Sequence, residues 1–382
     1  MNTDQAPSWL PSYLLPFVTI SYPAATPAAP DSFPDSKHYD LGLLDGCLMI
    51  SIIIAFAALR DVARLFILEP FARWWLTRVL VASKTATLAH PKEKANGTAN
   101  GNGHVFHDHT GDGHPPSANG NGHVAVTGIQ LSKREAKKMR KSVLRFAEQG
   151  WDLIYSSFAW GFGLYIHRHV PTRLLSPTDV WIGYPHIPLP GPIKFYYLME
   201  SAFYTHQILV INAEARRKDH WQMMTHHVIT VSLMLLSYSY NCTRVGCLVM
   251  FIMDWCDIWL PLAKMIRYMG LTTLCDITFV FWMLSWAVTR HGLFGLVIRS
   301  AFLDISRLIP SVWDPERGYF MTVEVKWMFI SMLAALEVLQ IIWFGMILRI
   351  AWRVITGSNA EDSRSDDEDD ADSSEVESKK DR

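Results

Sequence analysis

The sequence predicts an all-α fold, a polytopic membrane helix bundle of about seven transmembrane helices. Half of the 382 residues are apolar and only 19% are charged, and the charged residues gather in a few stretches. A helix needs about 20 mostly apolar residues to cross a hydrocarbon core of roughly 30 Å. Seven windows meet this requirement: 43–68, 149–166, 193–212, 223–240, 245–263, 274–296 and 327–352.

The basic residues predict how this bundle is oriented. The connection between the first two windows carries a run of Lys and Arg from Lys133 to Arg145, so the positive-inside rule places it in the cytosol. Each window crosses the membrane once, so every second connection lies on the same side. The connection after the third window, with Arg216, Arg217 and Lys218, is therefore also cytosolic. We therefore expect a lumenal N-terminus and a cytosolic C-terminus.

Composition divides the chain into five parts. The expected parts are a lumenal segment (1–42), a first transmembrane helix (43–68), a cytosolic loop with a disordered Gly-, Asn- and His-rich insertion (69–142), a catalytic membrane domain (143–354) and an acidic disordered cytosolic tail (355–382). The tail ends in Lys379, Lys380, Asp381 and Arg382, which is similar to a dilysine retrieval signal. This ending predicts the membrane of the endoplasmic reticulum.

Four ionisable residues lie inside two neighbouring apolar windows. His226 and His227 are in the fourth window, and Asp254 and Asp257 are in the fifth. At about 1.5 Å per residue, His227 lies roughly 12 Å from one end of its helix and Asp257 roughly 10 Å from the matching end of the next. Because ionisable groups are costly in hydrocarbon, side chains at matching depth predict a catalytic pocket within the bilayer.

Helical spacing assigns these side chains to faces. Asp254 and Asp257 are three residues apart and share a face, whereas His226 and His227 point about 100° apart and so are expected to do different work. Thr230 shares the face of His226.

Polar residues also recur at helical spacing in the third window. Such a stripe must face protein or a wet cavity in a bilayer, which makes Glu200 and Tyr204 candidate substrate-binding residues. In the last window we expect Glu337 to point into the bundle, because a carboxyl facing lipid is costly.

The alternatives to a catalytic pocket are a polar network that joins helices and a metal site. Polar side chains can simply bind helices to one another, but two His and two Asp at one depth favour chemistry. His and Asp also suit iron or zinc, yet membrane di-iron enzymes need more histidines in repeated boxes than His220, His226 and His227 supply. We therefore expect no metal.

The chain from about Arg145 to Trp352 resembles the ceramide synthases, whose membrane region is called the TLC domain. The resemblance is carried by RFAEQGW (145–151), IKFYYLMESAFYTHQ (from 193), NAEARRKDHWQMMTHHVIT (212–230), RVGCLVMFIMDWCDIWLPLAKM (244–265) and LQIIW (339–343). Met253 and Cys256 stand where the animal branch usually has His and Ser, and Met at the first place is similar to the fungal branch. The resemblance implies that six of the seven helices form the TLC domain.

The resemblance also implies an activity, the N-acylation of a sphingoid base by a fatty acyl-CoA. His226 or His227 would act as general base or as the nucleophile that forms an acyl-imidazole, and the sequence leaves both routes open. Asp254 and Asp257 would orient an imidazole or hold the amine and hydroxyls of the base. The cluster Arg216, Arg217 and Lys218 would meet the phosphates of CoA.

The remaining implications concern partners and rivals. No cofactor is expected beyond acyl-CoA as co-substrate, and the partners are the sphingoid base and membrane lipid, with no nucleic acid. The family further implies a homodimer or a heterodimer with a paralogue, and in fungi a small single-span subunit. The rival functions are a specialised paralogue that acts on or protects against sphinganine-like toxins and a non-enzymatic TLC-type lipid sensor.

Overall fold

The structure is a computed structural model that describes residues 9–89, 124–126, 129–213 and 219–356. Helices make up most of this part of the chain, and the few strands in it are two or three residues long. The predicted all-α membrane bundle is confirmed. The predicted insertion and the acidic tail lie almost wholly outside the described residues.

Each predicted window overlaps one long helical segment. The first segment joins α2 (Asp45–Val62), η2 (Ala63–Leu68) and α3 (Glu69–Ala89), and the next four are α4 (Lys133–His169), α5 (Gly191–Ala213), α6 (His220–Ser239) and α7 (Thr243–Tyr268). The sixth joins α8 (Thr272–Trp286), η4 (Ala287–Leu293) and α9 (Phe294–Leu303), and the last is α11 (Val323–Ile355). Both η2 and η4 are π-helical turns.

Membrane crossings are indicated by the length and composition of the helices. Among the described residues, four helices are long and apolar enough to span a bilayer: Asp45–Ala82, Thr243–Tyr268, Thr272–Leu303 and Val323–Arg353. The helices α4, α5 and α6 carry many polar side chains, including the predicted site residues of α5 and α6, which lowers their hydropathy. Seven crossings therefore stay a prediction.

The first two helices are longer than hydropathy indicated. The first continues past residue 68 to Ala89, into what was predicted to be loop. The second begins at Lys133, where Ser132 and Glu135 form a reciprocal capping box. The extensions pack on each other through Ala72, Val143 and Phe146. Hydropathy detects only the apolar part of a helix, and these ends are held by packing instead.

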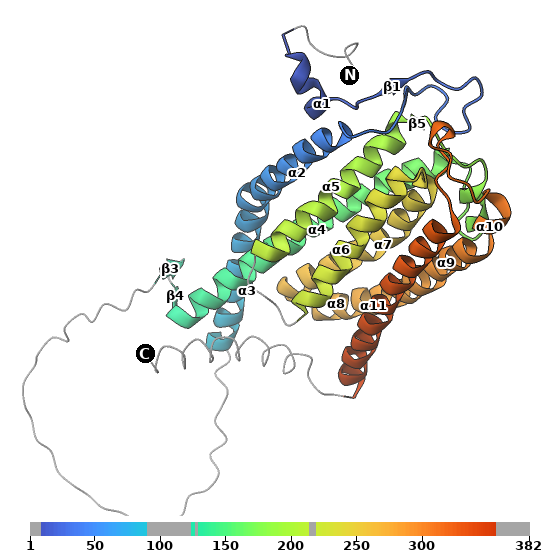
Figure 1. The fold of residues 1–382 in the computed structure, drawn as a ribbon. Coiled ribbons are helices and arrows are strands. Elements are labelled where there is room, and N and C mark those ends of the chain that lie inside the picture. The colour runs from blue at the N-terminus through green and yellow to red at the C-terminus, as the bar shows by residue number, and fades with distance from the viewer. Residues whose placement is uncertain (1–8, 90–123, 127–128, 214–218, 357–382) are drawn as a thin grey trace, which may run out of the picture.

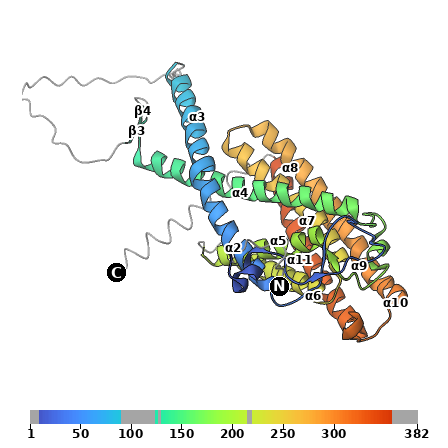
Figure 2. The same cartoon turned by 90° about the horizontal axis from the view of Figure 1, so that it is seen from above.

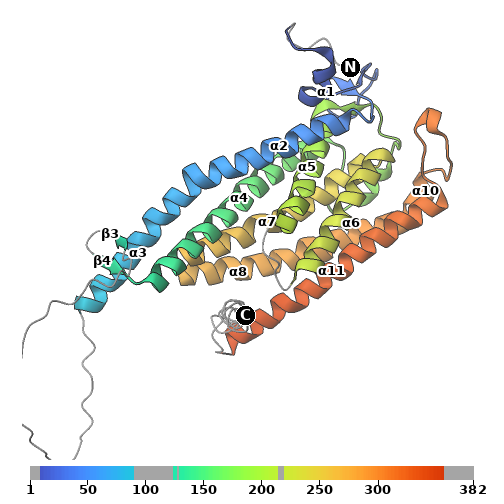
Figure 3. The same cartoon turned by 60° about the vertical axis from the view of Figure 1, so that its left-hand side comes forward.

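The long helices lie side by side as a bundle. The joined α2–α3 helix forms one edge and α11 the opposite edge (Figures 1 and 3). Between them α5 packs on α2 and α6, while α4 packs along α7 and crosses the α2–α3 helix (Figure 2).

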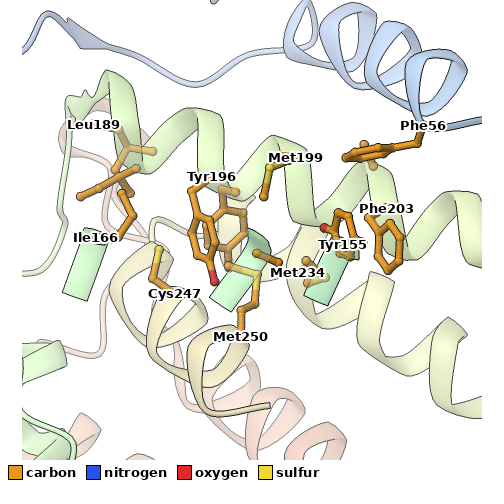
Figure 4. Close-up of a cluster of buried hydrophobic side chains, with 14 of the residues drawn as sticks. Phe56, Tyr155, Ile166, Leu189, Tyr196, Met199, Phe203, Met234, Cys247 and Met250 are labelled. Atoms are coloured by element: carbon orange, nitrogen blue, oxygen red, sulfur yellow. The ribbon is translucent and has the colours of Figure 1, made fainter. Parts of the chain in front are cut away.

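Two apolar clusters fill the bundle. One joins α2, α4 and α5, where the rings of Phe56, Tyr155 and Phe203 gather (Figure 4). The other joins α7, α9 and α11 to the short helix η3 (Pro177–Trp181), with Phe294 and Val297 fully buried.

One end of the bundle is closed by the short elements, and we call it the strand end. Here β1 (Pro23–Ala24), β2 (His38–Tyr39) and β5 (Leu189–Pro190) form an antiparallel sheet in the order β1-β2-β5, with His38 opposite both Ala24 and Pro190. The other short elements are η1 (Ser12–Leu14), α1 (Leu15–Val18), α10 (Ile305–Leu308), η5 (Pro315–Arg317) and, at the opposite end of the molecule, the hairpin β3 (Val124–Val126) and β4 (Ile129–Leu131).

A buried ion pair fastens the N-terminal segment to this end. Lys194 on α5 is fully buried, and its Nζ lies 2.7 Å from Asp45 Oδ1 on α2. The same ammonium donates hydrogen bonds to the backbone oxygens of Ser21 (3.0 Å) and Asp40 (2.6 Å). Tyr238 on α6 donates to Asp45 Oδ2 at 2.8 Å. One charged pair thus joins three helices and the segment that precedes them.

We expect Lys194→Ala to destabilise the protein by about 3–5 kcal/mol, because it leaves Asp45 buried without its counter-charge. The thermal midpoint of the detergent-purified protein measures this loss. Lys37→Ala, which removes an exposed ammonium at the same end, is the control and should leave the midpoint unchanged. A Lys194→Ala midpoint equal to that of the wild type would contradict this role.

Candidate active site

A cavity lies between α5, α6, α7, α11 and the segment from η4 to α10. Its polar end is formed by Tyr204, His226, Thr230 and Arg290, and most of its remaining wall is apolar. That remaining wall comprises Trp181, Tyr197, Leu233, Met234, Ser237, Cys242, Val245, Gly246, Val249, Met250, Met253, Ala301, Ile305, Met321, Phe329, Leu333 and Leu336.

The cavity is long and leads from the middle of the bundle to the strand end. Its lining residues on α6 run from His226 to Ser237, which is about 16 Å at 1.5 Å per residue. Those on α7 run the opposite way, from Met253 back to Val245. Trp181 and Met321 line it where the short elements close the bundle. The shape suits one extended hydrocarbon chain with a reactive group at its inner end.

His226 presents its ring to the polar end of the cavity. The ring packs edge-on against Trp343 of α11, with centroids 5.0 Å apart, and against His227 at 5.3 Å. Its Nδ1 atom is buried and has no hydrogen-bond partner among the described residues. A buried ring nitrogen without a partner is available to a bound substrate.

His227 is held differently, as the helical spacing predicted. Its Nδ1 lies 2.8 Å from the backbone oxygen of Met223. Because a carbonyl can only accept, Nδ1 carries the proton, and the neutral ring then has a lone pair on Nε2. The ring centroid lies 6.0 Å from that of Tyr204.

The two aspartates form hydrogen bonds with residues other than the histidines. Asp257 Oδ1 accepts a hydrogen bond of 2.6 Å from Arg290, and Asp254 Oδ1 accepts a long one of 3.4 Å from Tyr204. Among the described residues neither carboxylate is hydrogen-bonded to an imidazole. The hydrogen bond that orients His227 is made with the backbone of α6 and not with a carboxylate. Both expected roles of the aspartates, orienting or stabilising an imidazole and holding a substrate, stay predictions.

Arg290 on η4 was missed in the sequence. Its guanidinium is buried, pairs with Asp257, donates to the backbone oxygen of Met253 at 2.9 Å and lies over the ring of Trp286 at 4.7 Å. The signal was present, because Arg290 and His291 are ionisable residues inside the predicted sixth window, and the rule that selected the histidines applies to them equally.

The other predicted site residues divide into three groups. Thr230 and Tyr204 line the cavity, and Thr230 Oγ1 is buried without a partner. Glu200 is fully buried and accepts a hydrogen bond of 3.1 Å from Tyr155, away from the cavity lining. Arg216, Arg217 and Lys218 lie outside the described residues.

The prediction for Glu337 is confirmed. Its Oε1 lies 2.6 Å from Nδ1 of His291, so the side chain points from α11 towards η4. This histidine could have been found by the same signal as Arg290.

The arrangement suits acyl transfer. A neutral imidazole with a free nitrogen can take a proton or attack a carbonyl carbon, and a buried cation beside it can stabilise a developing oxyanion. Within the described part of the chain, no group of three or more His, Cys, Asp or Glu side chains is placed to hold a metal ion.

Comparison with known proteins identifies the family. A family model for the TLC domain matches residues 145–349, which is more than half of the chain and coincides with the region marked by the sequence motifs. The chain belongs to the TLC-domain family. The match covers the helices α5, α6, α7 and α11 that carry the cavity, and the N-terminal segment and the α2–α3 helix precede it.

Several relatives with a name come from fungi. The chain is 39% identical over 230 residues to a sphingosine N-acyltransferase of Schizosaccharomyces pombe, an alignment that covers 60% of this chain and 59% of the relative. It is 36% identical over 258 residues to a sphingosine N-acyltransferase-like protein of Alternaria alternata (60% of each chain). It is 37% identical over 261 residues to a ceramide synthase of Gibberella moniliformis, covering 62% of this chain and 61% of the relative.

These comparisons confirm the resemblance to ceramide synthases, including its fungal character. The aligned part spans about 60% of the length of these relatives.

Proposed function

We propose that this protein is a ceramide synthase that N-acylates a sphingoid long-chain base with a fatty acyl-CoA, releasing ceramide or dihydroceramide and CoA. The observation that carries the proposal is the cavity, an apolar slot whose inner end holds a free imidazole nitrogen. The names of the fungal relatives support the same reaction.

In the reaction, the amine nitrogen attacks the thioester carbonyl carbon and the bond from carbon to sulfur breaks. The amine loses a proton and CoA leaves as the thiol. His226 would take that proton as general base. Alternatively its nitrogen attacks the thioester carbonyl first and CoA leaves, and the amine then attacks the acyl-imidazole and displaces the imidazole. Either route passes through a tetrahedral oxyanion, and Arg290 lies at the same end of the cavity to stabilise it.

The fatty acyl chain would occupy the apolar length of the cavity. Ala301 is fully buried and lines it on α9, three helical turns beyond Arg290 towards the strand end. We expect Ala301→Leu to shift the preferred acyl-CoA to shorter chains, because the larger side chain fills part of the slot. Turnover ratios for a series of saturated acyl-CoAs measure the shift.

The matched control for this substitution is Ala334→Leu, which adds the same atoms to an exposed position of α11. Its chain-length preference should equal that of the wild type. The same preference in Ala301→Leu as in this control would show that the acyl chain lies elsewhere.

The setting of the reaction is also part of the proposal. The enzyme would reside in the membrane of the endoplasmic reticulum with a lumenal N-terminus, so that the strand end is lumenal and CoA stays cytosolic. Arg216, Arg217 and Lys218 would bind the CoA phosphates, and no further cofactor is required. The family implies a dimer with itself or a paralogue, and a small single-span subunit.

The function is tested by purifying the full-length protein in detergent and incubating it with a panel of acyl-CoAs and long-chain bases. Mass spectrometry should detect N-acyl product that depends on both substrates. Binding of either lipid without product would favour the lipid-sensor alternative, which the free imidazole at the end of the cavity argues against. Exclusive use of sphinganine-like toxins would favour the specialised paralogue.

A further inference from the structure

A second polar pair lies beside the cavity and has no part in the reaction just described. His291 on the π-helical turn η4 and Glu337 on α11 are joined by one hydrogen bond of 2.6 Å. Both side chains are about four-fifths buried, with exposures of 22% and 18%. Phe344 packs edge-on against the imidazole at 5.0 Å.

Each member of the pair has one polar atom without a partner. His291 Nε2 and Glu337 Oε2 are both buried and make no hydrogen bond among the described residues. Because a carboxylate can only accept, the hydrogen of this bond is on Nδ1. A ring that carries this one hydrogen offers a lone pair at Nε2, beside the lone pairs of Glu337 Oε2. Leaving two acceptors unpaired in a bilayer is costly, so the site is built for a ligand that brings two donors.

Residues next to His291 and Glu337 in the sequence line the cavity. Arg290 precedes His291 and lines the polar end, and Leu336 precedes Glu337 and lines the wall. On α11 the residue one turn before Glu337, Leu333, also lines the cavity. A ligand held between η4 and α11 would thus lie directly beside the reactive end.

The outer side of the pair faces the apolar surface of the bundle. Val288 on η4 and Val338 and Ile341 on α11 are more than half exposed, as side chains in contact with lipid are. Gly292 leaves open space next to His291, since a Cβ there would meet only the backbone oxygen of Ala287, at 3.7 Å. A lipid in the bilayer could bring a polar head to this seam while its chain stays in hydrocarbon.

We propose that the seam between η4 and α11 is the binding site for the amino-alcohol head of the long-chain base, with the ammonium on Glu337 and a hydroxyl on His291. An ammonium is the donor best matched to a carboxylate, and the neighbouring hydroxyl matches the imidazole lone pair. The site holds the amine next to the end of the cavity where the thioester would lie. This assignment rests on the proposed function for the identity of the lipid.

The test uses the full-length protein in phosphatidylcholine nanodiscs. Binding is measured for sphinganine, for octadecylamine (amine alone) and for 1,2-octadecanediol (hydroxyls alone), and KM is measured for each substrate. The variants are Glu337→Gln, Gly292→Leu to fill the open side, and the control Glu324→Gln, which alters an exposed carboxyl on the same helix. Thermal melting verifies that each variant is folded.

We expect Glu337→Gln to weaken sphinganine and octadecylamine binding by about ten- to a hundredfold, the range for losing a hydrogen bond to a charged group. The diol affinity and the KM for acyl-CoA should change by less than about twofold. Gly292→Leu should raise the KM for the base alone, and Glu324→Gln should match the wild type. Sphinganine affinity within about twofold of the wild type in Glu337→Gln would overturn the proposal.

Failure of this binding site and failure of the proposed function would give different results in these experiments. A wild-type protein that acylates no base, but whose amine binding still depends on Glu337, would keep the site and reject the synthase. Turnover with a KM for the base that is unchanged in Glu337→Gln would keep the synthase and reject the site. Nanodiscs containing phosphatidylethanolamine should not compete with sphinganine. Competition would assign the site to any lipid amine and overturn its assignment to the long-chain base.

Discussion

Replacing His226 by Ala is expected to abolish N-acylation, lowering kcat by about 10²- to 10⁴-fold, the range for losing a general base. The reason is its position: the imidazole lies at the inner end of the cavity with a buried, unpartnered nitrogen. His227→Ala should lose activity to a similar extent, because the two rings are in contact. Single-turnover mass spectrometry on purified protein measures both.

The control is His206→Ala, which removes a buried histidine of α5 that does not line the cavity. It should keep near-normal turnover. All three variants should accumulate in the membrane, since neither His226 nor His227 is part of an ion pair among the described residues. Near-normal turnover in His226→Ala would remove this residue from the chemistry.

The ion pair of Asp257 and Arg290 should have the second largest effect. Arg290 is buried, whereas the Asp257 side chain is 43% exposed. Arg290→Ala removes the buried cation from the polar end of the cavity, so we expect the loss of most of the activity together with a measurable loss of stability. Asp257→Asn should lose most activity as well. Thermal melting and initial rates measure the two effects separately. Arg299→Ala, an exposed arginine on the same helical segment, is the control for charge.

The double variant Asp257→Asn with Arg290→Gln tests the coupling. Both charges are then absent, so stability should recover relative to Arg290→Ala while activity stays lost. Chelators should not inhibit the wild type, and added metal should not rescue Asp257→Asn. Inhibition by a chelator, reversed by one particular metal, would instead support a metal site formed by these carboxylates.

The fold class follows from the sequence because transfer into hydrocarbon is governed by composition over about 20 residues. All seven predicted windows fall on long helical segments. What hydropathy could not place were the ends of α3 and α4, since those turns are held by packing between helices and by a capping box. Polar residues, including those predicted for the site, lower the hydropathy of α5 and α6, so the membrane crossing of these two helices stays a prediction.

The sequence also predicted chemistry for four residues of two helices, His226, His227, Asp254 and Asp257. It predicted that the histidines point about 100° apart and do different work, and the structure shows their rings in different surroundings. It did not predict the partners. The pairing of Asp257 with Arg290 joins residues 33 positions apart in the chain, and no local spacing encodes such a contact.

For this protein, the sequence by itself determined the helical membrane fold, the family and the candidate histidines of α6, since each depends on residue type or on local spacing. Only the tertiary structure decided that the backbone of α6 holds the His227 ring, that Arg290 completes the polar end of the cavity, and that His291 meets Glu337. The physical reason is that a buried polar group takes whichever partner the packing of distant helices brings within hydrogen-bonding distance. The sequence states which groups need partners, and the packing of the bundle selects them.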